Sequence, residues 1–566
     1  MPKPEVVILV GGEAGQGLVT VGTLLSKAFV RAGYDVCVTQ GYQSRIRGGH
    51  NTYELRAAVH DIAAPADEVD FLVALDETTL AADGPALRAG GVAIAAEDAE
   101  APAATLRVPY KTLCPPRYAN VAAAGVVGFL TGLPQETLVG VVEDAFQKKP
   151  DEAAANRDAL AAAYAWAAAN GAPFVRPLPA ATPRPPRVML NGNVAIALGA
   201  ASAGAKFCAF YPMTPATGVP LTLAAHARTL GLVVEQAEDE MAAVNMACGA
   251  SFAGAPSLVA TAGGGFALMV EGVSLAAMTE TPLVVVVGQR PAPATGLPTR
   301  TEQGDLDFVL HAGHGEFPRA VFAPGTVEDC FHLTRKAFEL AARYQGPTFV
   351  LTDQWLADSE RAVVLFDVDN LLPLAAYLPP ASYPTPYRRY EITADGVSPR
   401  LLPGLGDELV VADSDEHTED GHLTEDLGVR KAMVEKRLRK WEGLRAAIVP
   451  PAYYGLDGAE NVLVCWGSTG GAAREAAAAL TAAGTAVAVL HFTQVYPLDP
   501  PAFLPRLVKA LRVIGVEGNA GGQFTGLLRR EAGFHVDKFI TRYDGLPMTP
   551  AYIRAALERL IAEEVS

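Results

Sequence analysis

Residues 5–17 of the chain read EVVILVGGEAGQG and decide its fold class. The apolar run from Glu5 to Val10 predicts a short buried strand, and the glycines from Gly11 to Gly17 predict a tight turn. Leu18 to Ala32 then has the length and composition of a helix. Strand, glycine turn and helix in this order are typical of an α/β fold on a parallel, doubly wound sheet.

Length and composition limit the classes of function. The chain has 566 residues, which favours three or four domains at about 150 residues each. Half of the residues are apolar and 19% are charged, which suffices for several buried cores and excludes a disordered chain. The formal net charge of −17 argues against nucleic acid or an anionic membrane as the main partner, because phosphate binding needs a basic surface.

The cysteines give no metal motif. No two of them have a C-x-x-C spacing, so neither a zinc nor an iron–sulfur site is predicted in this chain. We expect reduced thiols in a cytoplasmic protein. The first residues lack a signal-peptide pattern, and no apolar run reaches the roughly 20 residues that span a bilayer.

Composition changes along the chain predict five segments. Three are α/β units, one is a proline-rich linker, and one is an irregular insertion that ends in a basic helix. The predicted α/β units are residues 1–172, 187–360 and 456–566, the linker is 173–186, and the insertion is 361–455.

The first glycine turn is a candidate anion site. Backbone N–H groups at Gly12, Gly15, Gln16 and Gly17 face the start of a helix, where an anion is stabilised. The turn lacks the Walker Gly-Lys-Ser/Thr, and Thr39-Gln40 replaces the acid that a dinucleotide fold needs. A tight turn without a ligand is an equally good interpretation. Three possible cations follow, and they either hold a phosphate, face a partner or are simply solvated: Arg45, Arg47 and His50.

The second α/β unit carries more polar chemistry. Tyr211-Pro212-Met213-Thr214-Pro215 follows a predicted strand, at the edge where open α/β sheets bind ligands, and Thr214 presents a hydroxyl from a stiff turn. A Pro/Gly/Thr-rich loop runs from Gln289 to Leu306 and contains Arg290 and Arg300. Guanidinium groups match carboxylates bidentately, so this loop is a candidate oxoanion clamp. Pairing at a surface or an interface is the alternative for Arg300.

A cluster of acids opens the next helix. Glu238 and Asp239 are best explained as capping residues at a helix N-terminus. Glu240 stands directly before Met241-Ala242-Ala243, and we expect it at a buried, closely packed surface. Gly263-Gly264-Gly265 forms a further glycine turn after a strand.

These segments together resemble the alpha subunits of 2-oxoacid:ferredoxin oxidoreductases, which use thiamine diphosphate, with the gamma domain fused at the N-terminus. Two positions depart from the usual pattern, where Thr261–Gly265 replaces Thr-Ser-Gly-Pro-Gly and Ala292–Ala294 replaces Gly-Pro-Ser. The segments that carry the resemblance, in order, are Gly11–Gly17, Arg47–Gly49, Tyr211–Pro215, Glu238–Glu240, Thr295–Leu306, His314–Pro318, and Glu416-His417 through Lys436-Arg437.

The resemblance implies a division of labour. It makes residues 1–172 the gamma domain, 187–360 the pyrimidine-side thiamine diphosphate domain, and 456–566 a transketolase C-terminal-like domain. It also implies a beta subunit that supplies Mg²⁺, the diphosphate site and a [4Fe–4S] cluster, in an (αβ)₂ assembly without which this chain is inactive. The chain itself lacks a Gly-Asp-Gly with a downstream Asn, and no metal site is expected in it.

Residue roles also follow from the resemblance. Glu240 hydrogen-bonds to the aminopyrimidine and lets the cofactor lose its C2 proton. Thr214 and Arg290 contact the substrate, and Arg300 is a candidate for a second carboxylate. Tyr211, Pro212, Gly263, Gly264 and Gly265 line the cofactor, and coenzyme A approaches the loop of Gly12, Gly15, Gln16 and Gly17.

The 2-oxoglutarate type is the best match, because of the fused gamma domain and the Glu416–Arg437 segment. The implied reaction makes succinyl-CoA and CO₂ and reduces ferredoxin, and it also runs backwards as CO₂ fixation in a reductive TCA cycle. Pyruvate and branched-chain 2-oxoacids are the alternative substrates. Two further hypotheses are a dinucleotide-dependent dehydrogenase and a non-catalytic nucleotide-binding or assembly subunit.

Overall fold

The computed structural model describes residues 4–42, 49–102, 105–182, 184–371, 374 and 383–565. Arg45, Arg47 and Gly48, which the sequence singles out, lie outside these residues. The chain divides into two compact units. Unit 1 is residues 1–190, 359–365 and 549–555, and unit 2 is residues 191–358, 366–548 and 556–566.

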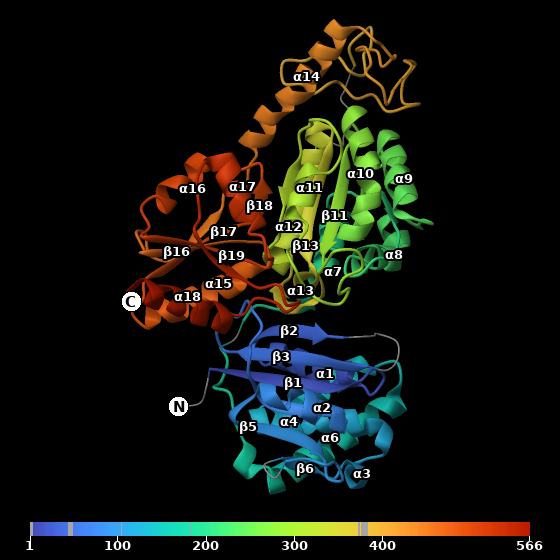
Figure 1. Ribbon diagram of the computed structural model, residues 1–566. Helices are drawn as coiled ribbons and strands as arrows, with labels where there is room; N and C mark the ends of the chain where they lie inside the picture. Colours follow the sequence, from blue (N-terminus) through green and yellow to red (C-terminus); the bar gives the residue numbers. More distant parts are fainter. Residues whose placement is uncertain are drawn as a thin grey trace. The chain divides into compact units, whose positions relative to one another are not determined.

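Unit 1 is built on one eight-stranded sheet with helices packed against it (Figure 1). The strands in spatial order are β6 (Leu106–Val108), β5 (Leu87–Ala96), β4 (Val69–Ala74), β1 (Glu5–Glu13), β3 (His50–Ala58), β2 (Asp35–Gly41), β14 (Glu360–Val364) and β7 (Arg187–Leu190). The helices are α1 (Leu18–Arg31), α2 (Glu77–Asp83), α3 (Tyr110–Leu113), α4 (Ala119–Thr131), α5 (Gln135–Ala145) and α6 (Pro150–Asn170).

The sheet of unit 1 is mixed, in contrast to the parallel sheet that we predict there. Strands β6, β5, β4 and β1 are parallel, whereas β3 is antiparallel to both β1 and β2, and β14 is antiparallel to β2 and β7. Strand β3 reads HNTYELRAA, and it is not predicted from apolar runs because several of its residues are polar. An antiparallel neighbour needs only a short loop rather than a crossover helix.

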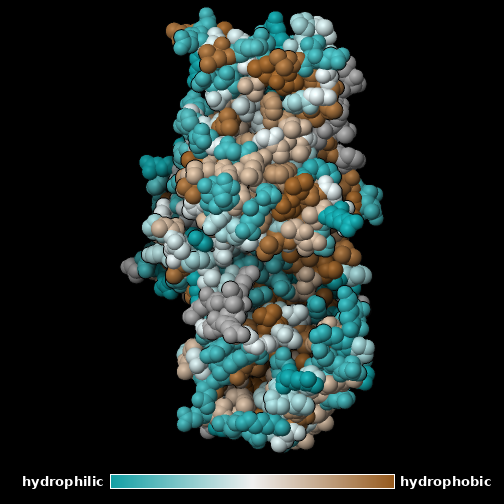
Figure 2. Space-filling view, turned by 90° about the vertical axis from the view of Figure 1, so that its right-hand side faces the viewer, coloured by the Kyte–Doolittle hydropathy of each residue, from teal (hydrophilic) through white to brown (hydrophobic). Residues whose placement is uncertain are grey.

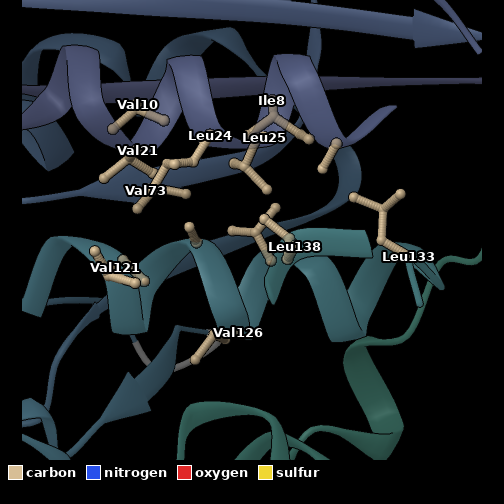
Figure 3. Close-up of a cluster of buried hydrophobic side chains, with 14 of the residues drawn as sticks. Ile8, Val10, Val21, Leu24, Leu25, Val73, Val121, Val126, Leu133 and Leu138 are labelled. Atoms are coloured by element: carbon tan, nitrogen blue, oxygen red, sulfur yellow. The ribbon is translucent and has the colours of Figure 1, made fainter. Parts of the chain in front are cut away.

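The core of unit 1 lies between the sheet and the helices α1 and α4. Figure 3 shows Ile8, Val10 and Val73 of the strands facing apolar side chains of both helices. Leu24 and Leu25 project from α1, and the cluster is almost free of solvent. Burial of this apolar area stabilises the glycine turn, because the turn joins β1 to α1 directly. Gly11 and Gly12, which we predict in the turn, lie at the end of β1, so the turn is residues 14–17.

Unit 2 contains two further sheets, so the predicted α/β class with three sheets is confirmed. The larger sheet is parallel except at its edge, where β18 pairs antiparallel with β12. Its strands in spatial order are β18 (Gln494–Tyr496), β12 (Ala320–Phe322), β13 (Pro347–Asp353), β11 (Leu283–Gln289), β10 (Ser257–Ala262), β8 (Phe207–Phe210) and β9 (Val233–Gln236). The helices around it are α7 (Gly192–Ser202), α8 (Gly218–Leu230), α9 (Glu240–Phe252), α10 (Gly263–Met278), α11 (Leu306–His311), α12 (Val327–Tyr344) and α13 (Gln354–Asp358).

The smaller sheet of unit 2 has five strands, and only its edge strand β15 is antiparallel. In spatial order they are β15 (Ala452–Tyr454), β17 (Val487–Phe492), β16 (Asn461–Trp466), β19 (Arg512–Glu517) and β20 (Lys538–Thr541). The accompanying helices are α15 (Thr469–Ala482), α16 (Pro500–Leu507), α17 (Gln523–Ala532) and α18 (Pro550–Val565), the last of which begins in unit 1.

The segment before the smaller sheet is fixed to the larger one by a buried ionic cluster. The predicted basic helix is α14 (Leu427–Ala446), and its Lys436 and Lys440 each lie 2.5 Å from a carboxylate oxygen of Glu280. Arg389 donates to the backbone oxygen of Glu280 over 2.7 Å. The two lysines hold the pKa of Glu280 well below its usual range against the effect of burial. Removing one partner would leave a buried charge, so the cluster pins α14 in place.

All six cysteines are buried free thiols: Cys37, Cys114, Cys208, Cys248, Cys330 and Cys465. Burial raises the pKa of Cys208, Cys248 and Cys465 to about 12, which makes these thiols unreactive. In the part of the chain that the structure describes, no helix is long and apolar enough to cross a membrane.

Candidate active site

Glu240 is the first residue of α9, and its position follows from the capping of that helix. The Asp239 side chain is the N-cap and accepts a hydrogen bond from the Ala242 backbone over 2.8 Å, as the sequence predicts. This cap turns the next side chain inward, and Glu240 is only 3% exposed. Its Oε1 atom is buried, and none of the described residues forms a hydrogen bond with it. An unpaired buried carboxylate oxygen is costly, which marks it as a site for a ligand.

The glycine turn at the start of α10 leaves room for two acids. A methyl group on Gly265 would lie 2.4 Å from Glu240 Oε1 and 2.2 Å from Thr261 Oγ1. A methyl group on Gly263 would lie 2.5 Å from a carboxylate oxygen of Asp305, whereas Gly264 is open. The turn therefore requires glycine at positions 263 and 265, because a carboxylate packs against each of them. Cofactor binding by these glycines stays a prediction.

Arg290 and Thr214, which we predict to contact the substrate, are in contact with each other. Strand β11 ends at Gln289, and the Arg290 side chain reaches across to donate a 2.8 Å hydrogen bond to the Thr214 backbone oxygen. Burial lowers the pKa of Arg290, although its pKa lies far above neutrality in any protein, so the group stays charged. A half-buried guanidinium beside a threonine turn is a suitable anion site.

The other predicted residues are placed as follows. Tyr211 and Pro212 follow β8 and are exposed. Arg300 is half-buried, and its side chain lies against Gly545, where a Cβ would be 3.1 Å from the Arg300 Cβ. The described contacts of Arg300 do not include Arg290 or Thr214, so its role stays a prediction.

The 290–305 loop is anchored to the smaller sheet. Gln303 donates to the Trp466 backbone oxygen over 2.9 Å and accepts from the Gly518 backbone over 2.8 Å. Thr301 donates to the buried carboxylate of Asp353 over 3.2 Å. These residues are absent from our sequence-based candidates, because only the fold brings them together. Their effect is to hold a proline- and glycine-rich loop in one shape.

Unit 1 has a pocket of about 520 Å³ at the carboxyl ends of β1, β4 and β5. Ligands of open α/β sheets bind at this edge. The predicted Gly15, Gln16 and Gly17 line the pocket, whereas the Gln16 side chain oxygen occupies the space next to Gly12. Lys111 and Arg117 are the basic side chains of the pocket, and they are not among the residues that the sequence singles out. Lys111 pairs with Asp98 at 2.5 Å, and His50 pairs outside this pocket with Asp83 at 2.7 Å.

Apolar side chains are exposed on the face of unit 2 that carries α8, α9 and α10. Brown patches mark this face in Figure 2. Strand β9 is an edge strand, so its outer side has no strand partner within its sheet. The exposed apolar residues in these elements are Leu221, Leu230, Val233, Met241, Met246 and Leu268. Such patches are typical of protein–protein contact.

Comparison with known proteins defines the class first. Residues 198–436 match the family described as "Pyruvate flavodoxin/ferredoxin oxidoreductase, thiamine diP-bdg", and residues 7–166 match "Pyruvate ferredoxin/flavodoxin oxidoreductase". The first match covers the buried acid, the Arg290–Thr214 contact and both ends of the glycine turn. The class is therefore that of oxidoreductase subunits with a thiamine diphosphate-binding domain.

Relatives over the whole length give the family. The chain is 30% identical over 619 residues to subunit alpha of the 2-oxoacid:ferredoxin oxidoreductase 1 of Aeropyrum pernix, covering 96% of both chains. It is 29% identical to the 2-oxoglutarate oxidoreductase subunit KorA of Mycobacterium tuberculosis, covering 99% of this chain and 92% of that one. The chain belongs to the alpha subunits of the 2-oxoacid:ferredoxin oxidoreductases, and the predicted resemblance is confirmed.

A solved structure agrees with this assignment. The 2-oxoglutarate:ferredoxin oxidoreductase from Magnetococcus marinus, solved with 2-oxoglutarate, coenzyme A and succinyl-CoA bound, is 31% identical and superimposes with a TM-score of 0.91. The match covers 99% of this chain and 100% of that chain. Family membership makes this chain a subunit of an oxidoreductase that has a partner subunit and uses ferredoxin.

Proposed function

We propose that this chain is the alpha subunit of an enzyme that oxidises 2-oxoglutarate with coenzyme A to succinyl-CoA and CO₂ and reduces ferredoxin. The observation that carries the proposal is the buried, unpaired oxygen of Glu240, and the Arg290–Thr214 pair adds a charged group for the substrate. The Magnetococcus marinus relative, which binds 2-oxoglutarate and succinyl-CoA, supports this substrate over pyruvate and branched-chain oxoacids.

Glu240 fits thiamine diphosphate. Its Oε1 has no protein partner among the described residues, so a ring nitrogen of the aminopyrimidine satisfies it. When bound, this cofactor supplies a nucleophilic carbon for decarboxylation of 2-oxoacids. Glu240 would hold a proton for that ring nitrogen at Oε1, and the packing that buries this atom excludes water from it. Tyr211, Pro212 and the turn at 263–265 line the same site.

Arg290 and Thr214 then orient the substrate. The guanidinium is held by the Thr214 backbone oxygen, and its remaining N–H groups are directed to the carboxylate next to the keto carbon. Thr214 offers its hydroxyl to the keto end of the substrate. Arg300 takes the second carboxylate of 2-oxoglutarate, together with groups of the partner subunit. Orientation of this kind lowers the barrier without taking part in bond making.

The partner subunit completes the site. We propose that it carries the Mg²⁺, the diphosphate-binding residues and a [4Fe–4S] cluster, in an (αβ)₂ assembly in the cytoplasm. No group of three or more metal-binding side chains occurs within the described ranges of this chain. The exposed apolar side chains of α8, α9 and α10 support docking of a partner on the face nearest Glu240.

We assign the segments accordingly. Residues 1–172 form the gamma domain, 173–186 the linker, 187–360 the pyrimidine-side domain, 361–455 a connection, and 456–566 the transketolase C-terminal-like domain. The family matches over residues 7–166 and 198–436 support the first and third assignments.

The pocket of unit 1 binds the phosphate groups of coenzyme A in this proposal. Its glycine loop presents the N-terminus of α1, and Arg117 adds positive charge, whereas Lys111 pairs with Asp98, which lines the pocket together with Glu97. Replacing both Lys111 and Arg117 by alanine is expected to raise the KM for coenzyme A by about tenfold, since each lost charge contact is worth about 0.7 kcal/mol. The KM for the 2-oxoacid should stay constant, because no residue that lines this pocket of unit 1 belongs to the candidate site around Glu240 in unit 2.

Steady-state kinetics of the complex at varied coenzyme A measures this effect. Lys148→Ala is the matched control, because Lys148 is exposed in the same unit and does not line the pocket. An unchanged KM for coenzyme A in the double variant would contradict the assignment.

The proposed function is tested by co-expressing the chain with the gene product encoded next to it. We expect coenzyme A-dependent reduction of a viologen dye with 2-oxoglutarate, at a kcat/KM well above those for pyruvate and 2-oxoisovalerate. The purified chain alone should be inactive. Preference for pyruvate or 2-oxoisovalerate would contradict the proposed substrate but not the family assignment. Turnover by the chain alone would contradict the proposal that the partner subunit completes the active site.

A further inference from the structure

Asp305 is a buried acid at the candidate site that the mechanism above does not use. It is the last residue of the 290–305 loop, and its backbone N–H donates a 3.0 Å hydrogen bond to the side chain oxygen of Gln289. Gln289 in turn donates to the Thr352 backbone oxygen over 3.2 Å. This glutamine therefore fastens the end of the loop to the strand end from which Arg290 projects.

The carboxylate of Asp305 points into the glycine turn. Both of its oxygens lie within 2.6 Å of the position that a Gly263 Cβ would take, and the residue is 8% exposed. Within the described residues, no group donates a hydrogen bond to this carboxylate. The charged groups that act on it are Arg290 from the end of β11 and Glu302 from its own loop. Across the turn, Gly265 packs against Glu240 of α9.

We propose that Asp305 is a positioning residue that sets how much positive charge Arg290 offers to the substrate carboxylate. The ionised acid offsets the guanidinium and repels an anionic substrate. When Asp305 is protonated it carries no charge, so the full positive charge of the Arg290 guanidinium acts on the substrate carboxylate. This inference rests on the proposed role of Arg290 as the carboxylate clamp.

The charge of this acid changes near pH 6. Burial raises the pKa of Asp305 to about 6, against an opposing effect of Arg290. As pH rises through 6 the carboxylate ionises, so the affinity for a 2-oxoacid should fall. Burial also raises the pKa of Glu302, and the negative charge of Asp305 raises it further. Glu302 therefore needs a control variant of its own.

The test uses Asp305→Asn in the complex with the partner subunit. Asparagine keeps the size of the side chain, and the Gln289 bond to the backbone remains. For the wild type, we expect the KM for 2-oxoglutarate to rise by about threefold to tenfold between pH 5.5 and 7.5, as one charge is added near the clamp. The variant should keep the low KM throughout. Glu302→Gln is the matched control and should retain the wild-type rise.

A second measurement separates this role from a structural one. Because its folded-state pKa exceeds the unfolded value, ionised Asp305 lowers stability as pH rises from about 4 to 6. Asp305→Asn should therefore raise the Tm at pH 7.5 and leave it unchanged near pH 4. A lower Tm at pH 7.5, or a variant KM that still rises with pH, would overturn the proposal.

The failure of this inference differs from failure of the proposed function. If Arg290→Ala raises the KM while Asp305→Asn keeps the wild-type pH dependence, only the role of Asp305 is overturned. If Arg290→Ala leaves the KM unchanged, the clamp itself is wrong, and the role of Asp305 fails with it. Binding of glutarate by calorimetry over the same pH range provides a readout without turnover. Its affinity for the wild type should fall with rising pH, and its affinity for Asp305→Asn should not.

Discussion

Replacing Glu240 by alanine is expected to abolish thiamine diphosphate-dependent decarboxylation while leaving the chain folded and assembled. The loss should be at least about 100-fold in kcat, the size typical of a missing acid–base group. The physical reason is that Glu240 Oε1 is the buried, unpaired oxygen of the site, and alanine has nothing to share with the cofactor ring. Single-turnover decarboxylation of 2-oxoglutarate by the complex measures the effect.

Three further variants make the test specific. Glu238→Ala removes an exposed acid two positions away and should behave like the wild type. Glu240→Gln keeps the shape of the side chain but removes its charge, and this variant should be nearly as inactive as Glu240→Ala. Gly265→Ala should also impair decarboxylation, because its methyl group would lie 2.4 Å from Glu240 Oε1. Wild-type turnover by Glu240→Ala would contradict the assignment.

Stability provides an independent reading of the same residue. A buried polar atom without a partner costs about 1–3 kcal/mol, so removing it relieves that cost in the free chain. Alanine leaves a small cavity, which offsets the gain. We therefore expect the Tm of the Glu240→Ala chain to stay close to the wild-type value. A residue that served the fold would instead lower the Tm strongly when truncated, so the comparison separates the two roles.

Much of unit 2 could be predicted because its central strands carry the signal locally. Leu283–Val287 is apolar throughout, since it is covered on both faces, and the predicted strand is present as β11 (Leu283–Gln289). The burial of Glu240 was likewise predicted, because the small residues Ala242 and Ala243 that follow it indicate close packing. Its role toward the cofactor came from the family resemblance. Asp239 as the cap follows from its residue type alone.

The rest depends on contacts between distant residues. Strand β14 lies in the predicted insertion, yet it pairs with β2 and β7 in unit 1, and nothing in its own sequence specifies that partner. Asp305 was overlooked for the same reason. In the sequence it is one acid in a polar loop, and only the fold places Gly263 against it and Arg290 near it. Lys111 and Arg117 line a pocket that exists only once β5 is in place.

Replacing Arg290 by alanine is expected to raise the KM for 2-oxoglutarate by about 10- to 100-fold. A charge-assisted hydrogen bond to a carboxylate is worth about 1.5–3 kcal/mol, which corresponds to that range. Steady-state kinetics at saturating coenzyme A measures it. Arg290→Lys keeps the positive charge but loses the planar, bidentate guanidinium. Its KM for 2-oxoglutarate should therefore lie between those of the wild type and Arg290→Ala. Arg228→Ala is the matched control, because Arg228 is exposed near the end of α8.

The ratio of the two kinetic effects shows how Arg290 acts. A guanidinium that only clamps the ground-state carboxylate changes KM and leaves kcat alone. Arg290 also donates to the Thr214 backbone oxygen, so its removal loosens the turn that presents the threonine hydroxyl. We therefore expect a smaller fall in kcat beside the rise in KM, and Thr214→Ala should reproduce that fall without the rise. An unchanged KM in Arg290→Ala would remove the clamp from the mechanism and leave Arg300 and the partner subunit to hold both carboxylates.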